Sequence, residues 1–218
     1  MVFPNKRRGT SGLTLVECLA IIAIIIIIWY GFLFYLTATS PRKGQRPACL
    51  RNLKQIGAAH LRFANDHDGK FPAQTPANEG GSKEWAGTPK VFRHFLVLSN
   101  ELGDPKVLMC PSDYDRVCAT NFGNLRTTNL SYWVDLNAQN GSSQSLLMGD
   151  RNLMLGGDYL TNGCYWIASA APLNWSHHLH NMAGNLGLGD GSVIKAGNLT
   201  LTKQRLQQPI PRNWLAIP

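Results

Sequence analysis

Three histidines and an aspartate in the C-terminal part of the chain are the side chains best suited to chemistry. His177, His178 and His180 lie in the segment WSHHLHN, and nine residues separate His180 from Asp190. Imidazoles beside a carboxylate can bind a metal ion or transfer protons. However, the sequence contains neither of the zinc-binding frameworks CxxC and HExxH. We therefore expect these residues to fix loops by hydrogen bonding.

Ser176 precedes the histidines and is the nucleophile that they would activate in a hydrolase. A serine hydrolase of the α/β type carries its nucleophile in a G-x-S-x-G motif, which the sequence lacks. We expect the protein to catalyse no reaction and to need no cofactor.

A long apolar run extends over residues 13–36, and Glu17 is its only acidic or basic residue. At 1.5 Å per residue, a helix of this length crosses the ~30 Å hydrocarbon core of a bilayer. Basic residues 6–8 precede the run, so the positive-inside rule places the N-terminus in the cytoplasm and the rest of the chain outside it. An unpaired carboxylate in such a segment costs several kcal/mol, so Glu17 is expected to be functional. The alternative is a carboxylate that reaches the nearby interface.

The composition is that of a folded protein with one such segment. The chain has 218 residues, of which 44% are hydrophobic and 16% charged, and its formal net charge is +8. Extensive disorder is excluded, and a mean hydropathy of −0.13 excludes a polytopic membrane protein. Much of the positive charge flanks the apolar run and no groove-reading motif is present, so nucleic acid is not an expected partner.

After the apolar run, the pattern predicts a break and a second helix. Pro41 and Pro47 bracket a polar linker at which the long helix is expected to bend or break. Apolar residues then recur at helical spacing up to residue 66, and His60 and His67 are expected on the surface of this helix. The apolar stripe consists of Leu50, Leu53, Ile56, Ala59 (or His60) and Phe63.

Short strands are expected in the remaining part. Residues 70–90 are typical of a loop, and residues 91–103 of a short helix. Strands are predicted over 107–113, 131–136, 144–150 and 164–169, a hairpin over 184–197 with its turn at Asp190-Gly191, and a helix over 201–208. A helix followed by hairpin-connected strands gives an α+β fold, with the N-terminal helix packed on a mainly antiparallel sheet.

The N-terminal residues resemble the leader and junction of type IV prepilins and type II secretion pseudopilins. KRRGTSG followed by LTLVECLA has the basic leader, the glycine, four uncharged residues, the glutamate and the apolar run of that family. The resemblance implies that a prepilin peptidase cleaves after Gly12 and that the new terminus, Leu13, is methylated. Leu13 departs mildly from the usual Phe. In a filament, Glu17 would pair with the terminal ammonium of a neighbouring subunit's Leu13 and so fix the register of the helices.

The C-terminal half resembles the H-x9-DG domain found with prepilin-type N-termini. His180 and Asp190-Gly191 supply the motif, in region 180–191. CLRNLKQIGAAHLRFANDHDGKFP, LMCPSD and NLSYWVDL…QSLLMGDRNL are similar to recurrent segments of that group. The resemblance implies no ligand for the motif.

Four cysteines lie beyond the apolar run, where an oxidising compartment favours disulfides. They are Cys49, Cys110, Cys118 and Cys164, which allow three connectivities. Cys49 and Cys110 lie in segments shared with the H-x9-DG group, so the resemblance favours Cys49–Cys110 and leaves Cys118–Cys164; a short Cys110–Cys118 loop is the alternative. Cys18, in the apolar run, is interpreted as a small apolar side chain.

Calcium is a weaker expectation, which comes from the C-terminal calcium loop of major pseudopilins. Such a site needs six to eight oxygen ligands. Asp150, Asp158 and Asp190 are the candidates, although their spacing matches no calcium loop.

Together these features predict a filament subunit in four parts. They are a cleaved leader (1–12), a transmembrane and assembly helix (13–38), a linker with an amphipathic helix (39–66) and an exported domain (67–218). Its partners would be other pilin or pseudopilin subunits, the prepilin peptidase, the inner-membrane platform of a secretion machine and lipid. The alternative is an envelope protein, anchored in the membrane, that binds a glycan through Trp85, Trp133, Trp166 or Trp175.

Overall fold

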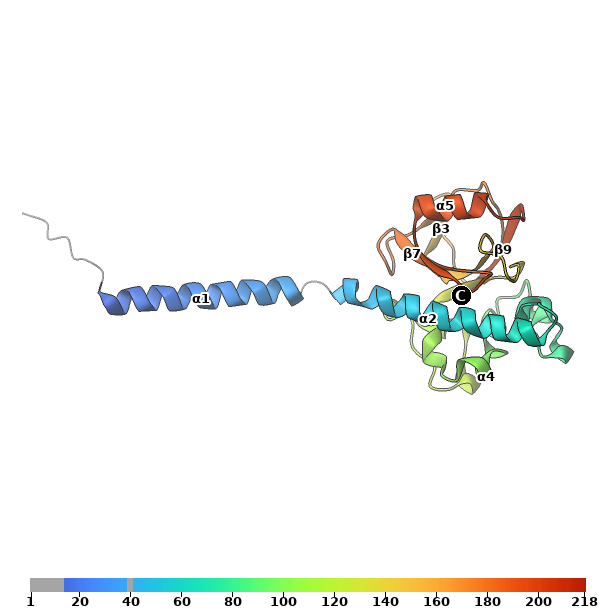
Figure 1. Ribbon diagram of the computed structural model, residues 1–218, viewed down its shortest axis with the longest axis horizontal. Coiled ribbons are helices and arrows are strands. Elements are labelled where there is room, and N and C mark those ends of the chain that lie inside the picture. Colours follow the sequence, from blue (N-terminus) through green and yellow to red (C-terminus); the bar gives the residue numbers. More distant parts are fainter. Residues whose placement is uncertain (1–13, 39–40) are drawn as a thin grey trace, which may run out of the picture. The chain divides into compact units, whose positions relative to one another are not determined.

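The computed structural model describes residues 14–38 and 41–218, which belong to two compact units, residues 1–41 and 42–218. The predicted leader, which ends at Gly12, and the predicted new terminus, Leu13, lie outside the described residues. The first unit contains α1 (Leu15–Ala38), the predicted apolar helix (Figure 1). One stretch of it, Leu15–Leu33, is long and apolar enough to cross a membrane.

Helix α2 (Pro41–Asp66) begins earlier than the sequence pattern indicated. The prediction of a polar linker up to Pro47 was wrong, because this segment is helical and Pro47 lies inside the helix. Pro41 occupies the first helical position, where a backbone N–H would have no intrahelical acceptor in any case. Pro47 removes one intrahelical hydrogen bond without ending the helix.

Leu53 and Ile56 of the α2 stripe pack on the main sheet of the second unit (Figure 1), whereas Ala59 and Phe63 pack on Leu98. Leu53, Ile56 and Ala59 are fully buried, as predicted. A Cβ atom on Gly57 would lie only 3.1 Å from Met148 Cε, so helix and sheet approach closely there. The helix ends where Gly69, in a left-handed conformation, donates its N–H to the Ala64 carbonyl.

His60 was predicted on the helix surface, and this is wrong. Its side chain is buried, with Nδ1 2.9 Å from the Ile56 carbonyl oxygen and its ring edge-on to Phe71 and Phe95. Helical spacing allowed either Ala59 or His60 in the stripe, and the segments after α2 fold back so that both are buried. His67 is half-buried, stacked on Phe63.

The buried imidazole of His60 should make the domain sensitive to acid. Burial lowers the pKa of His60 to about 4, whereas an unfolded histidine titrates near 6.5. The unfolded chain therefore takes up a proton first, and stability is lost as the pH falls from 6.5 towards 4. The difference in pKa corresponds to on the order of 3 kcal/mol. Urea unfolding at pH 7 and pH 4.5 should show a smaller acid loss in His60→Leu than in the wild type; equal losses would contradict this assignment.

The segment between α2 and the sheet is mostly irregular. The predicted loop 70–90 contains three 3₁₀ turns, and the helix predicted over 91–103 forms as two short ones. The turns are Pro72–Gln74, Ala77–Glu79 and Lys83–Trp85, and the helices are α3 (Phe92–Leu96) and α4 (Ser99–Leu102).

The strand predicted over 107–113 is wrong, because Pro105–Leu108 forms a 3₁₀ helix instead. The Asp104 carboxylate accepts a hydrogen bond from the Lys106 N–H and so caps this helix, and Pro105 fits its first position. Two more 3₁₀ turns, Phe122–Asn124 and Thr127–Asn129, precede the sheet.

The main sheet has six strands in the order β5-β9-β1-β2-β7-β8, and all its described pairs are antiparallel. The strands are β1 (Tyr132–Asp135), β2 (Leu146–Asp150), β5 (Gly163–Ala168), β7 (Ala183–Leu188), β8 (Val193–Gly197) and β9 (Arg212–Ile217). The predicted hairpin is confirmed as β7–β8, with Gly191 at a φ of 82° in its turn. The other strands predicted over 131–136, 144–150 and 164–169 are also confirmed.

Four strands were not predicted: β9 and a small sheet of β4 (Asp158–Tyr159), β3 (Leu153–Leu155) and β6 (Leu173–Trp175). Helix α5 (Asn198–Leu206) forms close to the predicted residues 201–208.

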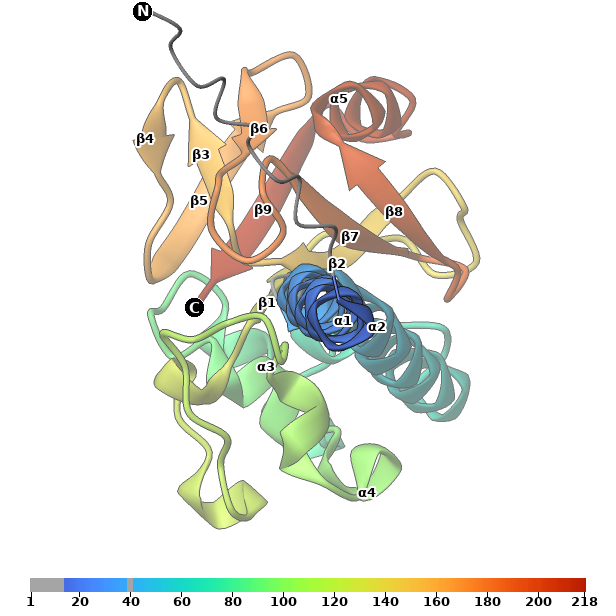
Figure 2. The ribbon, with the colours of Figure 1, turned by 90° about the vertical axis from the view of Figure 1, so that its left-hand side faces the viewer.

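The main sheet separates two cores (Figure 2). Alternate residues of β1 face opposite sides, so Tyr132 and Val134 join the core under α2, whereas Trp133 joins the core with Trp175 and with Leu201 of α5. Both faces of the sheet are therefore covered, which confirms the α+β fold with a mainly antiparallel sheet and a helix packed on it.

Candidate functional site

The first candidate site is the beginning of α1. The Thr14 N–H and hydroxyl each donate to Glu17 Oε2 at 2.8 Å, and the Glu17 N–H donates to Thr14 Oγ1 at 3.4 Å. This reciprocal arrangement is a capping box, which satisfies backbone donors at the helix N-terminus. Glu17 therefore has a structural role within its own chain.

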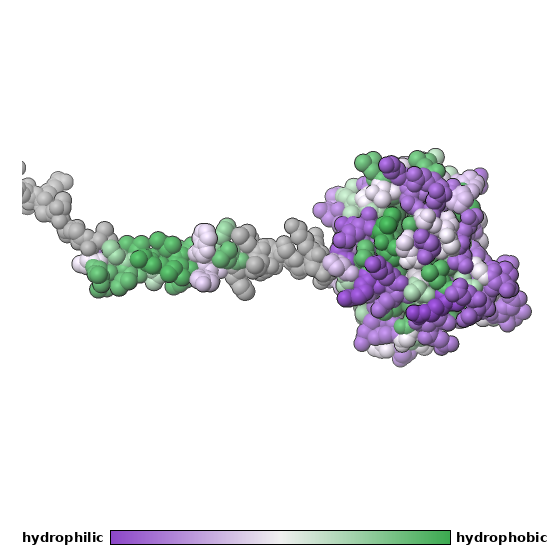
Figure 3. Space-filling model, in the orientation of Figure 1, coloured by the Kyte–Doolittle hydropathy of each residue, from purple (hydrophilic) through white to green (hydrophobic). Residues whose placement is uncertain are grey.

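The surface of α1 between Leu15 and Leu33 is mostly apolar (Figure 3). The large side chains between Leu15 and Leu33 are exposed, and isoleucines 24–28 are all among them. Cys18, interpreted from sequence as an apolar side chain, is also exposed on this helix. Exposed apolar surface of this extent is unfavourable in water.

The second candidate site lies inside the domain around a disulfide. Cys49 of α2 is bonded to Cys110, which confirms this predicted pair. The second predicted pair is not formed: Cys118 and Cys164 are free thiols. Cys118 Sγ lies 3.3 Å from Met109 Sδ, and the Cys164 thiol donates to the Thr88 carbonyl.

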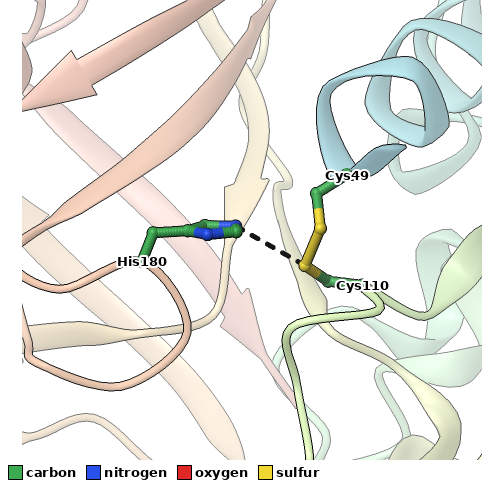
Figure 4. A group of neighbouring side chains, drawn as sticks. All are labelled: Cys49, Cys110 and His180. Atoms are coloured by element: carbon green, nitrogen blue, oxygen red, sulfur yellow. Dashed lines mark hydrogen bonds between the residues drawn. A yellow bond between two sulfur atoms is a disulfide. The ribbon is translucent and has the colours of Figure 1, made fainter. Parts of the chain in front are cut away.

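His180 points at this disulfide (Figure 4). Its Nε2 atom lies 3.5 Å from Cys110 Sγ and 3.5 Å from Asp150 Oδ2. Burial lowers the pKa of His180 to about 4, so the imidazole is neutral at pH 7. Asp190 is not its partner: β7 lies between the two residues, and Asp190 Oδ1 instead accepts hydrogen bonds from the Ser192 N–H and hydroxyl. The two ends of the H-x9-DG motif thus perform separate tasks.

Asp150 is fully buried at the end of β2. The Asn185 N–H and side-chain amide donate to its Oδ2 at 2.6 and 2.9 Å, whereas Oδ1 has no hydrogen-bond partner among the described residues. Burial raises the pKa of Asp150 to about 7, against the hydrogen bonds from Asn185 that lower it. Sequence reasoning proposed Asp150 only as a weak calcium ligand and missed its contact with His180.

The proposed calcium ligands do not gather. Asp158 is exposed on β4, Asp190 caps its own turn, and Asp150 is buried beside His180. Within the ranges that the structure describes, the group of side chains close enough to share a metal ion is Cys49, Cys110 and His180. This cysteine–histidine group offers sulfur and nitrogen rather than the oxygens that calcium requires.

The other two histidines lie outside this group, in the loop between β6 and β7. His177 Nδ1 is 3.0 Å from Asn181 Oδ1, and the His178 ring is edge-on to Tyr159. Both line a cleft of about 250 Å³ beside Asp113. Ser176 is buried, and its hydroxyl accepts the His178 backbone N–H.

The backbone of this loop is strained. Leu179, Asn181 and Met182 have φ between 52° and 58°, a left-handed conformation that costs non-glycine residues of order 1–3 kcal/mol each. The strained residues flank His180, so the loop holds its imidazole against the disulfide.

Two arginines stabilise the segments around the disulfide, His180 and Asp150, and neither was predicted from the sequence. Arg151 donates to both carboxylate oxygens of Asp113 at 2.7 Å, which fixes the chain just after Cys110. Arg46 of α2 donates to the Gly184 carbonyl at 3.2 Å, and its charge acts on both Asp150 and His180.

The four tryptophans proposed for glycan binding do not form one platform. Trp133 and Trp175 are fully buried in the core between the sheet and α5. Trp85 is half-buried under Lys90 and Arg93. Trp166 is 57% exposed and stacks on Trp214 of the neighbouring strand.

No protein-family model, curated protein or solved structure matches this chain.

Proposed function

We propose that the chain is a prepilin-like subunit of a type II secretion pseudopilus or a type IV pilus-like filament. A prepilin peptidase removes residues 1–12 and Leu13 is methylated. The subunit resides in the inner membrane, with a cytoplasmic N-terminus and an exported domain, until it assembles through α1. Its role is structural, it performs no catalysis, and its partners are other subunits, lipid and the platform of the secretion machine.

The observation that carries this proposal is the combination of Glu17 with the apolar surface of α1. Leu15–Leu33 has the length and hydropathy of a membrane span, and its apolar side chains are exposed. The capping box needs only a hydrogen-bond acceptor at this position, so a membrane anchor alone has no use for the negative charge of the carboxylate, which is costly in an apolar segment. A filament has one, because the carboxylate can bind the N-terminal ammonium of the adjacent subunit.

Processing tests the proposal most directly. Co-expression of the chain with a prepilin peptidase should reduce its mass by residues 1–12 and add one methyl group at Leu13. Mass spectrometry of the N-terminal peptide provides the measurement. An unprocessed terminus in the presence of an active peptidase would contradict the proposal.

Gly12→Val should block this maturation. The peptidase must fit a small residue beside the scissile bond, so the valine variant should remain in the membrane fraction with its leader attached. Gly9→Val is the matched control, because it changes a glycine of the same leader outside the junction and should be cleaved as the wild type is. Normal cleavage of Gly12→Val would refute the assignment of the junction.

The exposed Trp166 favours the alternative function, an anchored protein that binds a glycan through the Trp166–Trp214 pair. The two indole rings stack with ring centroids 4.7 Å apart, and Trp166 is 57% exposed, so the pair offers a large aromatic surface for contact with a ligand. An anchored receptor would keep residues 1–12 or lose them without methylation. Trp166→Ala would abolish glycan retention by a receptor but leave the processing of a filament subunit unchanged.

A further inference from the structure

The buried group around the Cys49–Cys110 disulfide contains the donor atoms of a soft metal site. We propose that, when this disulfide is reduced, the thiolates of Cys49 and Cys110 bind a zinc ion together with His180 Nε2, and that Asp150 supplies the fourth ligand. This site is independent of filament assembly, because its four residues all lie in the second unit.

The distances bring three of the four proposed ligands together, and the fourth lies beside one of them. Zinc bonds of ~2.0–2.3 Å place neighbouring tetrahedral ligands about 3.3–3.8 Å apart. His180 Nε2 lies 3.5 Å from Cys110 Sγ and 3.5 Å from Asp150 Oδ2. The donor atoms of Cys49, Cys110 and His180 all lie within 4.8 Å of one another (Figure 4), whereas Asp150 lies outside this group and would have to move its carboxylate towards the sulfur atoms to complete the tetrahedron. Once the S–S bond is broken, small side-chain rotations would separate the sulfur atoms to ligand spacing.

The four ligands come from elements that the fold holds in place. Cys49 lies on α2, Cys110 follows the 3₁₀ helix Pro105–Leu108, Asp150 ends β2, and His180 lies in the strained loop before β7. Cys49, Cys110 and Asp150 have no exposed surface, and the His180 side chain is 2% exposed. A reduced site would therefore be shielded from water by the surrounding core.

The surroundings supply the outer-shell contacts that metal sites require. Asn185 orients the Asp150 carboxylate with two hydrogen bonds, and Asp150 Oδ1 has no partner among the described residues. Two thiolates and a carboxylate around Zn²⁺ leave one negative charge. The nearby Arg46 guanidinium, whose charge acts on Asp150 and His180, would offset it.

The redox step balances with a dithiol as the reductant. The dithiol donates two electrons and two protons, the Cys49–Cys110 bond breaks into two thiols, and the dithiol becomes a cyclic disulfide. Binding of Zn²⁺ then releases the two thiol protons and forms two Zn–S bonds. The disulfide and the metal therefore exclude each other, and bound zinc should protect the two thiols from oxidation.

Titration of the full chain in detergent with Co²⁺ tests this site. The chain is reduced with a dithiol, freed of it by gel filtration under nitrogen, and compared with the oxidised chain. The reduced chain should bind one equivalent and show thiolate-to-cobalt charge-transfer bands with intense tetrahedral d–d bands. The oxidised chain should show neither.

Variants assign the ligands. His180→Gln should weaken Co²⁺ binding by more than the ~10–100-fold that loss of an outer-shell partner costs, and Cys49→Ser should remove the paired-thiolate spectrum. The double variant Cys118→Ser/Cys164→Ser is the matched control, because it removes the two other thiols of the domain and should bind as the wild type does. Absent bands in the reduced wild type, unchanged bands in His180→Gln, or lost bands in the control would overturn the proposal.

A second measurement needs no variant. One equivalent of Zn²⁺ should slow the re-formation of the Cys49–Cys110 disulfide in air by about tenfold or more, as followed by peptide mapping. Re-formation at an unchanged rate would overturn the proposal even if His180→Gln fails to fold.

Discussion

Replacing Cys49 and Cys110 together with serine is expected to lower the free energy of unfolding of the second unit, residues 42–218, by about 4 kcal/mol. The disulfide joins residues 61 positions apart, and closing a loop of that length restricts the unfolded chain by roughly this amount in the chain-entropy model. It also ties α2 to the segment before the sheet. Urea unfolding of the oxidised wild type and of the double serine variant, followed by tryptophan fluorescence, gives the difference.

Cys118→Ser/Cys164→Ser provides the matched control for this prediction as well. Both thiols are free and half-buried, so their loss should cost well under half as much. Because no disulfide is removed, the entropy of the unfolded chain stays the same. An equal loss of stability in the two double variants would show that the Cys49–Cys110 bond does not restrict the unfolded chain.

Local signals in the sequence predicted those elements that depend on local chemistry. The β7–β8 hairpin was found because Gly191 can adopt the positive φ that its turn requires. The stripe of α2 was found because Leu53 and Ile56 recur at helical spacing. The strand predicted over 107–113 failed because the Asp104 cap, also a local signal, was overlooked.

Elements that depend on distant partners could not be found in this way. Strand β9 is placed by its pairing with β1 and β5, which are far from it in sequence. His60 lies four residues after Ile56, so helical spacing also allowed it a place in the stripe, and the later segments around Phe71 and Phe95 enclose it.

The candidate metal site shows the same limit. The resemblance to the H-x9-DG group supplied Cys49–Cys110 but directed attention from His180 to Asp190. The pairing of β2 with β7 aligns Gly149 with Leu186, which sets Asp150 beside Asn185 and close to His180. Asp150 lies thirty positions before His180 in the sequence, and no spacing motif links two residues so far apart.

Glu17→Gln and Glu17→Ala should both abolish filament formation while leaving membrane insertion and leader cleavage intact. Insertion should improve, because removing a carboxylate from an apolar segment lowers the transfer cost by up to ~3 kcal/mol. Assembly should fail, because the Leu13 ammonium of the adjacent subunit would enter an apolar bundle unpaired, at a cost of ~3–5 kcal/mol. Filament yield is measured beside the amount of processed subunit in the membrane fraction.

The capping box makes the comparison of the two variants decisive. Glutamine at the third helical position can still accept the Thr14 N–H, so Glu17→Gln keeps the cap and removes only the charge, whereas Glu17→Ala removes both. Thr14→Val is the matched control: it removes the hydroxyl that contacts Glu17 Oε2 but keeps the carboxylate, so it should assemble. If Glu17→Gln assembled as the wild type does and Glu17→Ala did not, the carboxylate would serve only its own helix. In that case α1 would be an anchor, and the glycan-binding alternative would account better for the exposed Trp166.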